Sequence, residues 1–189
     1  MKRVIIIDNY DSFTYNLVHY IEQFTNDFKV ARNNEVDIKE IGTYNKILFS
    51  PGPGLPSEVE IMKDIIEKYK KTKSIFGICL GHQAIAEYFG AKLLNLHEVD
   101  HGIQKNTIVV DESEIIFKNI PKNFLSGRYH SWLIDKATLP KTLKITAVDN
   151  NDHIMAISHN KFNIKGVQFH PESIMTPEGL KIIENWILE

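Results

Sequence analysis

Residues 75–81 read Ile-Phe-Gly-Ile-Cys-Leu-Gly, and this stretch decides the fold. The apolar run 75–79 predicts a strand, and residues 80–89 predict a helix that Gly90 ends as a C-cap. The predicted strand therefore turns directly into the predicted helix at Cys79. One glycine stands two residues before this cysteine and another two residues after it.

The same order of strand, polar segment and helix occurs twice earlier in the chain. The run Val4–Ile7 predicts a strand buried on both faces, and the polar residues 8–12 and a helix follow it. Residues 47–49 lead in the same way into residues 50–54 and a second helix. This alternation favours parallel βαβ units, whose ligands bind beyond the carboxyl ends of the strands. We therefore expect both polar segments and Cys79 to meet at one edge of the sheet.

The second half of the sequence indicates a sheet that is partly antiparallel. Its predicted strands are short runs without such helices between them, at residues 107–110, 143–148, 154–158 and 164–169. Thr176 predicts the N-cap of a closing helix, with Pro177 at the first helical position. The predicted fold class is α/β: a single three-layer domain over residues 1–189, with a mixed, mostly parallel central sheet and helices on both faces.

Composition limits the partners. A formal net charge of −2 over 189 residues provides no basic surface for nucleic acid. The apolar run after the basic start has four residues, short of the ~7 of a signal peptide, and no stretch approaches the ~18 of a membrane span. We therefore expect a cytoplasmic protein with neither a nucleic-acid nor a membrane partner. One cysteine, and eight histidines without ligand spacing, predict no metal site.

The turn at Cys79 is typical of a nucleophile elbow. Flanking glycines let neighbouring backbones approach, and the side chain at the tip projects from the sheet. The helix that begins at Leu80 presents unpaired N–H groups and a positive partial charge, which favour a thiolate over a thiol. A free cysteine is more commonly buried as a small apolar side chain. From this segment alone, Cys79 is either a nucleophile or inert packing.

Residues 167–172, Val-Gln-Phe-His-Pro-Glu, contain a base for such a nucleophile. Residues two apart in an extended strand project to the same face, so His170 and Glu172 are expected side by side. An imidazole can take the thiol proton and later deliver it to a leaving amine, while a carboxylate fixes its tautomer. The alternative is an ordinary strand end with a solvated His and Glu. The order Cys, His, Glu differs from that of α/β-hydrolases, so the elbow belongs to another lineage.

Five ordered motifs along nearly the whole chain carry a resemblance to a known family. They are Asp8–Leu17 (Asp-Asn-Tyr-Asp-Ser-Phe-Thr-Tyr-Asn-Leu), Ser50–Gly54 (Ser-Pro-Gly-Pro-Gly), Gly77–Ala84, Gly127–Ser131 (Gly-Arg-Tyr-His-Ser) and Gly166–Ser173. The chain resembles a class I glutamine amidotransferase. The first motif is similar to the branch that serves anthranilate and p-aminobenzoate synthases, rather than to relatives in carbamoyl phosphate, GMP or CTP synthesis.

The resemblance implies a reaction for each matching residue. Cys79 attacks the side-chain amide of L-glutamine, His170 acts as base and acid, and Glu172 orients the imidazole. Ammonia leaves, and the γ-glutamyl thioester is hydrolysed to glutamate. The implied oxyanion hole consists of backbone N–H groups of Gly54 and Leu80, whose loss typically costs ~3 kcal/mol each. On its own, the segment 50–54 could equally be a plain surface turn.

The resemblance also implies a glutamine-binding set. These residues are Gly52, Pro53, Gly54, Gln83, Ser131 and Trp132. Trp132 stands where family members commonly have Leu, and Ile103-Gln104 replaces the usual basic and small residues of a family loop, so any role of that loop is open. We expect His82 and His130 to be structural.

The implied partner is the large chain of a chorismate-using synthase, which receives the ammonia and carries the Mg²⁺; no cofactor is expected in this chain. Two alternatives stay open on the residues alone. One is an amidase or peptidase of the same fold that acts on a non-glutamine amide. The other is a non-catalytic regulatory protein that retains the fold. The sequence does not decide between the anthranilate and p-aminobenzoate branches.

Overall fold

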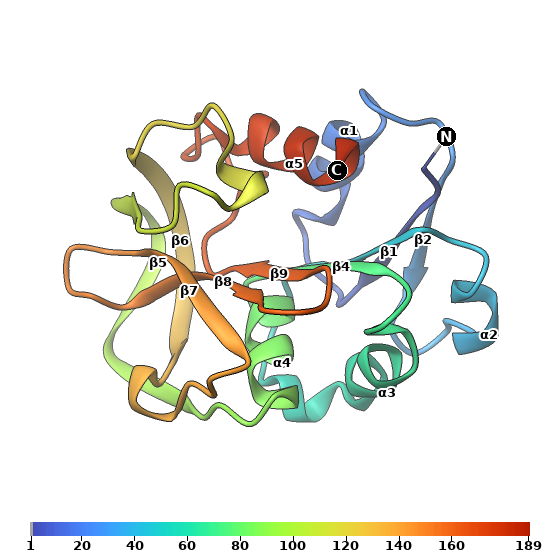
Figure 1. Ribbon diagram of the computed structural model, residues 1–189, viewed down its shortest axis with the longest axis horizontal. Helices are drawn as coiled ribbons and strands as arrows, with labels where there is room; N and C mark the ends of the chain where they lie inside the picture. Colours follow the sequence, from blue (N-terminus) through green and yellow to red (C-terminus); the bar gives the residue numbers. More distant parts are fainter. Residues whose placement is uncertain (1) are drawn as a thin grey trace.

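The computed structural model describes residues 2–189, apart from the side chains of residues 97 and 98. Nine strands within these residues form one sheet (Figure 1). The order is β2-β1-β3-β4-β9-β8-β7-β5-β6. Pairing is parallel from β2 to β9 and antiparallel from β9 to β6. The strands are β1 (Val4–Asp8), β2 (Phe28–Arg32), β3 (Lys46–Phe49), β4 (Ser74–Ile78), β5 (Leu93–Val109), β6 (Asn123–Ile134), β7 (Leu143–Val148), β8 (Ile154–His159) and β9 (Ile164–Val167).

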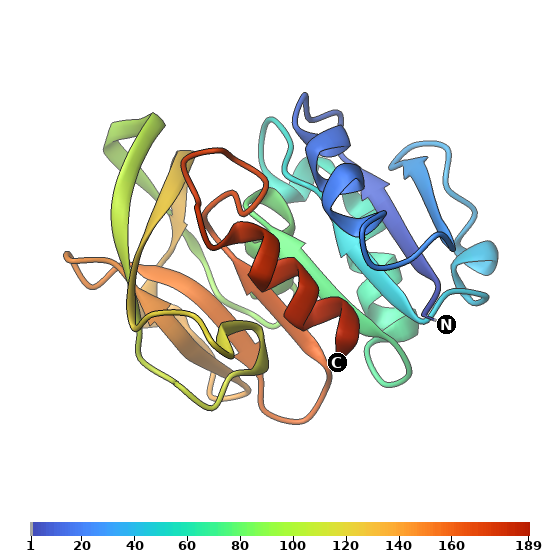
Figure 2. The same cartoon turned by 90° about the horizontal axis from the view of Figure 1, so that it is seen from above.

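Helices cover both faces of the parallel part of the sheet. In Figures 1 and 2, α1 and α5 lie together on one face, and α3 and α4 lie on the other. The predicted fold class, a mixed α/β sheet between two helical layers, is therefore confirmed. No described helix is long and apolar enough to cross a membrane. The helices are α1 (Thr14–Ile21), α2 (Ile38–Ile41), α3 (Glu60–Tyr69), α4 (Leu80–Tyr88) and α5 (Gly179–Leu188), with 3₁₀ turns at Pro56–Glu58, Ile115–Phe117 and Lys136–Thr138.

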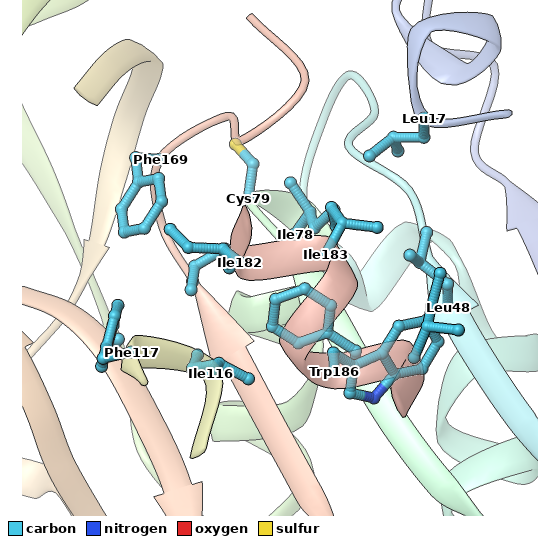
Figure 3. Close-up of a cluster of buried hydrophobic side chains, with 14 of the residues drawn as sticks. Leu17, Leu48, Ile78, Cys79, Ile116, Phe117, Phe169, Ile182, Ile183 and Trp186 are labelled. Carbon is cyan, nitrogen blue, oxygen red and sulfur yellow. The ribbon is translucent and has the colours of Figure 1, made fainter. Parts of the chain in front are cut away.

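The continuous apolar run of β1 serves two cores at once. Because successive side chains of a strand alternate between faces, Val4 and Ile6 pack in the core beneath α1 and α5, and Ile5 and Ile7 pack in the core of α3 and α4. Figure 3 shows the first core from the side of α5, with Trp186 among its side chains. A run buried on both faces is what the sequence predicted.

The backbone at the end of β4 is strained and tightly enclosed. Cys79 has φ 50° and ψ −101°, a conformation that non-glycine residues rarely adopt. A Cβ on Gly77 would lie 2.4 Å from the carbonyl carbon and oxygen of Gly81, and one on Gly81 would lie 2.5 Å from the Cβ of Phe49. The backbone N–H of Cys79 donates to the carbonyl oxygen of Val167 in β9 (2.8 Å). The predicted tight turn between strand and helix is confirmed.

The polar segments that follow β1 and β3 meet the elbow at one edge of the sheet, as predicted. The backbone N–H of Asn9 donates to the Ser50 hydroxyl at 2.8 Å. A Cβ on Gly52 would lie 2.6 Å from the Asn9 Cβ and 2.9 Å from a methyl group of Leu80. The three segments are thus packed against one another.

Several details of the second half differ from the prediction. The strand expected at 107–110 is the end of the much longer β5, and β6 was not predicted. The strand expected at 164–169 ends at Val167, so His170 lies in a separate bridge to Gly127. The expected N-cap Thr176 is also wrong: α5 starts at Gly179, because the Thr176 hydroxyl instead donates to the carbonyl oxygen of His170 (2.6 Å).

We expect Gly77→Ala to lower the free energy of unfolding by at least about 3 kcal/mol, because the new methyl group would meet backbone atoms that cannot turn aside. Gly90→Ala is the matched control. Its φ of 105° is strained for alanine, but nothing lies within 4 Å of the added Cβ, so about 1 to 2 kcal/mol is expected. Urea unfolding measures both; equal losses would contradict the close packing at the elbow.

Candidate active site

A pocket of about 180 Å³ opens beside Cys79 at the carboxyl ends of β3 and β4. Every residue that the sequence placed in the oxyanion hole or the glutamine-binding set lines it. Its lining is Gly52, Pro53, Gly54, Cys79, Leu80, Gln83, Tyr129, His130, Ser131 and Trp132. Larger hollows lie elsewhere, such as one of about 520 Å³ between Val109 and Lys122, but no cysteine lines it. The chemistry therefore points to the smaller pocket.

His170 and Glu172 form a buried pair next to Cys79. The imidazole Nδ1 lies 2.7 Å from Glu172 Oε1, and both side chains are almost inaccessible to solvent. This contact was predicted, but its expected cause was wrong, because His170 lies in an isolated bridge and Glu172 in the turn that follows it, not on one continuous strand. With Nδ1 engaged, the imidazole Nε2 has no hydrogen-bond partner among the described residues. That nitrogen is available to a thiol.

A ring of hydrogen bonds replaces the strand as the support of His170. Its backbone N–H donates to the carbonyl oxygen of Gly127 at 3.1 Å. The N–H of Gly127 donates to the Thr176 hydroxyl at 2.9 Å, and that hydroxyl donates to the carbonyl oxygen of His170 at 2.6 Å. The ring fixes the backbone of His170 to β6 on one side and to the segment before α5 on the other. The sequence analysis assigned Thr176 to a helix cap and missed this role.

Charge and aromatic contacts set the state of the imidazole. Burial opposes the imidazolium, but the Glu172 carboxylate and the adjacent Cys79 side chain outweigh it and hold the pKa of His170 well above its ordinary value of 6.5. The rings of Tyr129 and Phe13 lie 4.8 and 6.2 Å from the imidazole, centroid to centroid. Asp11 lies near the pair, and burial raises the pKa of its carboxyl. The site therefore favours a protonated His170.

Both candidate oxyanion donors lie where the backbone is constrained. Gly54 has φ +75°, and a Cβ there would lie 2.0 Å from Glu58 Oε2, an oxygen that accepts from the backbone N–H of Leu55 (2.9 Å). A larger residue here would be strained by the positive φ and would displace the Glu58 carboxylate. Leu80 is the first residue of α4, where N–H groups have no partner within the helix.

Gln83 lies on the second turn of α4, and two hydrogen bonds fix its side-chain amide. Its Nε2 donates to the carbonyl oxygen of Trp132 at 3.0 Å and to Oε1 of Gln168 at 3.2 Å. Gln168 is fully buried and was not proposed as a site residue, nor was Tyr129. Their positions inside two of the five matching motifs were the signal that could have found them.

The remaining histidines of the motifs are neutral. His82 is fully buried, and burial lowers its pKa to about 3; a Cβ on Gly166 would lie 2.9 Å from its Nδ1. Burial, with Arg128 nearby, also lowers the pKa of His130 to about 3. His130 also lines the pocket.

The two departures from the family pattern have defined surroundings. Trp132 pairs across the strands with Asn95, whose amide oxygen can accept from the indole N–H at 3.2 Å. Gln104 Nε2 donates to the carbonyl oxygen of Met175 at 2.8 Å, so β5 is tied to the segment that follows Glu172. Ile103 is partly exposed.

Comparison with known proteins agrees with this site. The profile of the glutamine amidotransferase class-I family matches residues 5–189. Anthranilate synthase component 2 of Lactococcus lactis is 46% identical over 187 residues, 97% of this chain and 93% of that protein. Aminodeoxychorismate/anthranilate synthase component 2 of Bacillus subtilis is 40% identical over 186 residues, 97% of this chain and 95% of that protein. The chain also matches 32% of the length of the bifunctional protein TrpGD of Thermotoga maritima, at 41% identity and over 99% of this chain.

A solved structure of a related protein has the same fold. The crystal structure of a protein from Thermoplasma acidophilum, assigned to GMP synthase, superposes with a TM-score of 0.88 at 25% identity, over 99% of this chain and 92% of that one. The chain belongs to the class I glutamine amidotransferase family.

We expect Glu172→Gln to lower the pKa of His170, because it removes the nearest negative charge while burial remains. Carbon-13 NMR of labelled imidazoles over pH 5–9 measures the titration. His82 and His130 stay neutral throughout and provide internal references.

Because the pKa of His170 is raised in the folded chain, Glu172→Gln should also change how the free energy of unfolding depends on pH. The stability that the Glu172 charge provides is fully present below about pH 6.5 and is lost as the pH rises through the folded-state pKa. The difference in unfolding free energy between wild type and Glu172→Gln should therefore shrink from pH 6.5 upward. An unchanged His170 titration in the variant would show that Glu172 does not hold the imidazole protonated.

Proposed function

We propose that the chain is a glutaminase subunit that hydrolyses L-glutamine to glutamate and delivers the ammonia to a chorismate-using synthase. The observation that carries this proposal is the junction at Cys79. There a strained elbow presents the thiol to a buried His170–Glu172 pair and to a pocket lined by Gln83. Family membership and the names of the relatives support the same reaction.

The proton of Cys79 passes to Nε2 of His170, because Glu172 occupies Nδ1 and the raised pKa of the imidazole favours this transfer, so the reaction starts from a thiolate beside an imidazolium. The sulfur then attacks the amide carbon of glutamine and forms a tetrahedral intermediate. As the carbon–nitrogen bond breaks, His170 returns the proton to the nitrogen, and ammonia leaves. Water attacks the γ-glutamyl thioester, gives one proton to His170 and releases glutamate, and the imidazole reprotonates the sulfur.

The oxyanion of each tetrahedral intermediate would accept hydrogen bonds from the backbone N–H groups of Gly54 and Leu80. Both residues line the pocket with Cys79. Removal of one such donor typically costs a hundredfold or more in rate, about 3 kcal/mol. Gln83, Ser131 and Trp132 line the same pocket, where we assign them to binding of the glutamine substrate, together with Gly52 and Pro53.

A partner chain completes the proposal. Two of the relatives are named as components of anthranilate or aminodeoxychorismate synthases. We therefore assign the chorismate site, with its Mg²⁺, to a larger chain, and no cofactor to this one. Closure of the two chains around the pocket would keep ammonia from water, where it would protonate and diffuse away.

Cys79→Ser should reduce glutamate release from glutamine by at least about a thousandfold, because the hydroxyl is a far weaker nucleophile beside the same base. Release is measured with a glutamate dehydrogenase assay on the chain mixed with its synthase. Asparagine and a γ-glutamyl peptide serve as substrate controls. Undiminished turnover by the variant would remove the thioester mechanism, and turnover of the peptide in preference to glutamine would favour the amidase alternative.

A tagged chain should copurify from a lysate of its own cells with a chorismate-using synthase, and the complex should form an aminated product from chorismate and glutamine. Formation of anthranilate or of aminodeoxychorismate, separated by chromatography, identifies the branch. Cys79→Ser is the matched control, since its complex should form product from ammonium chloride but not from glutamine. Glutamine hydrolysis without any chorismate-dependent product would contradict the assigned partner.

A further inference from the structure

Gln168 lies between the pocket and the nucleophile. It follows β9 directly, is fully buried, and its backbone N–H donates to the carbonyl oxygen of Met155 in β8 (2.9 Å). Its side chain reaches in the other direction. Oε1 accepts from Gln83 Nε2 at 3.2 Å, and Nε2 lies 3.6 Å from the sulfur of Cys79, within hydrogen-bonding distance for sulfur.

The orientation of the Gln168 amide follows from a fixed acceptor. The carbonyl oxygen of Trp132 can only accept, so the Gln83 atom 3.0 Å away must be the NH₂ group. The same NH₂ group faces Gln168, which must therefore present its oxygen to Gln83. The NH₂ group of Gln168 is then left facing Cys79. A reversed amide would place two NH₂ groups against each other.

We propose that Gln168 is a further catalytic residue, whose side-chain N–H donates to the sulfur of Cys79 and stabilises the thiolate before attack. This inference rests on the proposed function, in which Cys79 is the nucleophile. A donor to an anion forms a stronger hydrogen bond than a donor to a neutral group, and burial strengthens the bond further. The amide therefore favours the charged sulfur over the thiol.

Gln83 has a second role under this proposal. It lines the pocket and also holds the oxygen of Gln168, so it acts as a positioning residue for the donor to Cys79. The series Trp132, Gln83, Gln168, Cys79 runs from the pocket wall to the reacting atom. Side chains that bind substrate and the side chain that prepares the nucleophile are thus parts of one network.

A merely structural Gln168 would give a different result. It would tie the end of β9 to α4 through Gln83, and its loss would lower the stability without any effect on the charge of the sulfur. The other ionisable groups near Cys79 are His170 and Glu172, with Asp11 and neutral His130 beyond them. All four are unchanged in the variants below, so a shift in thiol reactivity reports on Gln168.

The test is the rate of Cys79 alkylation by iodoacetamide between pH 5 and 9, with the full chain and two variants. Gln168→Met keeps the length of the side chain and adds no charge but has no N–H for the sulfur, and Gln168→Leu also shortens the side chain. We expect the midpoint of the profile to lie about one pH unit higher in each variant, so that at pH values below the wild-type midpoint each variant reacts about tenfold more slowly. Asn185→Leu is the matched control, since Asn185 is a buried amide that donates to backbone carbonyls of residues 116 and 118 instead.

A wild-type alkylation profile in either folded variant would overturn the proposal. Circular dichroism establishes which variants fold. If neither variant folds, the proposal is tested by NMR on the side-chain amide protons of Gln168 in the unaltered chain. Their chemical shift should change with pH at the same midpoint as the alkylation rate. A chemical shift that does not change with pH would overturn the proposal. Glutamine hydrolysis is measured separately, so a shifted profile in a chain without glutaminase activity would contradict the proposed function and leave the bond to Cys79 standing.

Discussion

The site depends on one constraint, the close packing of backbone segments around Cys79. Gly77 lies against Gly81, and Gly81 lies against Phe49, at distances that exclude any side chain. This packing holds Cys79 in a conformation with positive φ, which costs of order 1–3 kcal/mol and persists only because the neighbours fix it. Cys79 thereby stands at the N-terminus of α4, whose first N–H groups have no partner within the helix.

Strands β1, β3 and β4 of the parallel half and the residues of the candidate site could be predicted from sequence, because their signals are local. Apolar runs buried on both faces have few polar interruptions, and the glycines at 77 and 81 mark a close approach of backbones. Cys79, Gln83 and the 50–54 turn follow directly from those strands. A local pattern was enough to place them at one edge, since parallel strands share their carboxyl ends.

The rest depends on contacts between distant segments. β6 contains Gly127, Arg128 and His130, so it lacks the alternation that predicts a strand, and it exists because β5 pairs with it. β2 was missed as well: it is an edge strand in which no residue is fully buried. The support of His170 by Thr176 and the orientation of Gln168 arise from hydrogen bonds across 6 to 85 residues, which no spacing in the sequence reveals.

The ring through Thr176 has a consequence for synthesis of the chain on the ribosome. The elbow at Cys79 is translated early, but its backbone N–H donates to the carbonyl oxygen of Val167, and the Thr176 hydroxyl donates to the backbone carbonyl of His170. Gly179, at the start of α5, also lies against the carbonyl group of Pro171, where a Cβ would come within 1.7 Å of the oxygen. A growing chain therefore contains Cys79 for some ninety residues before His170 is anchored, and the proposed reaction requires that translation has passed that point.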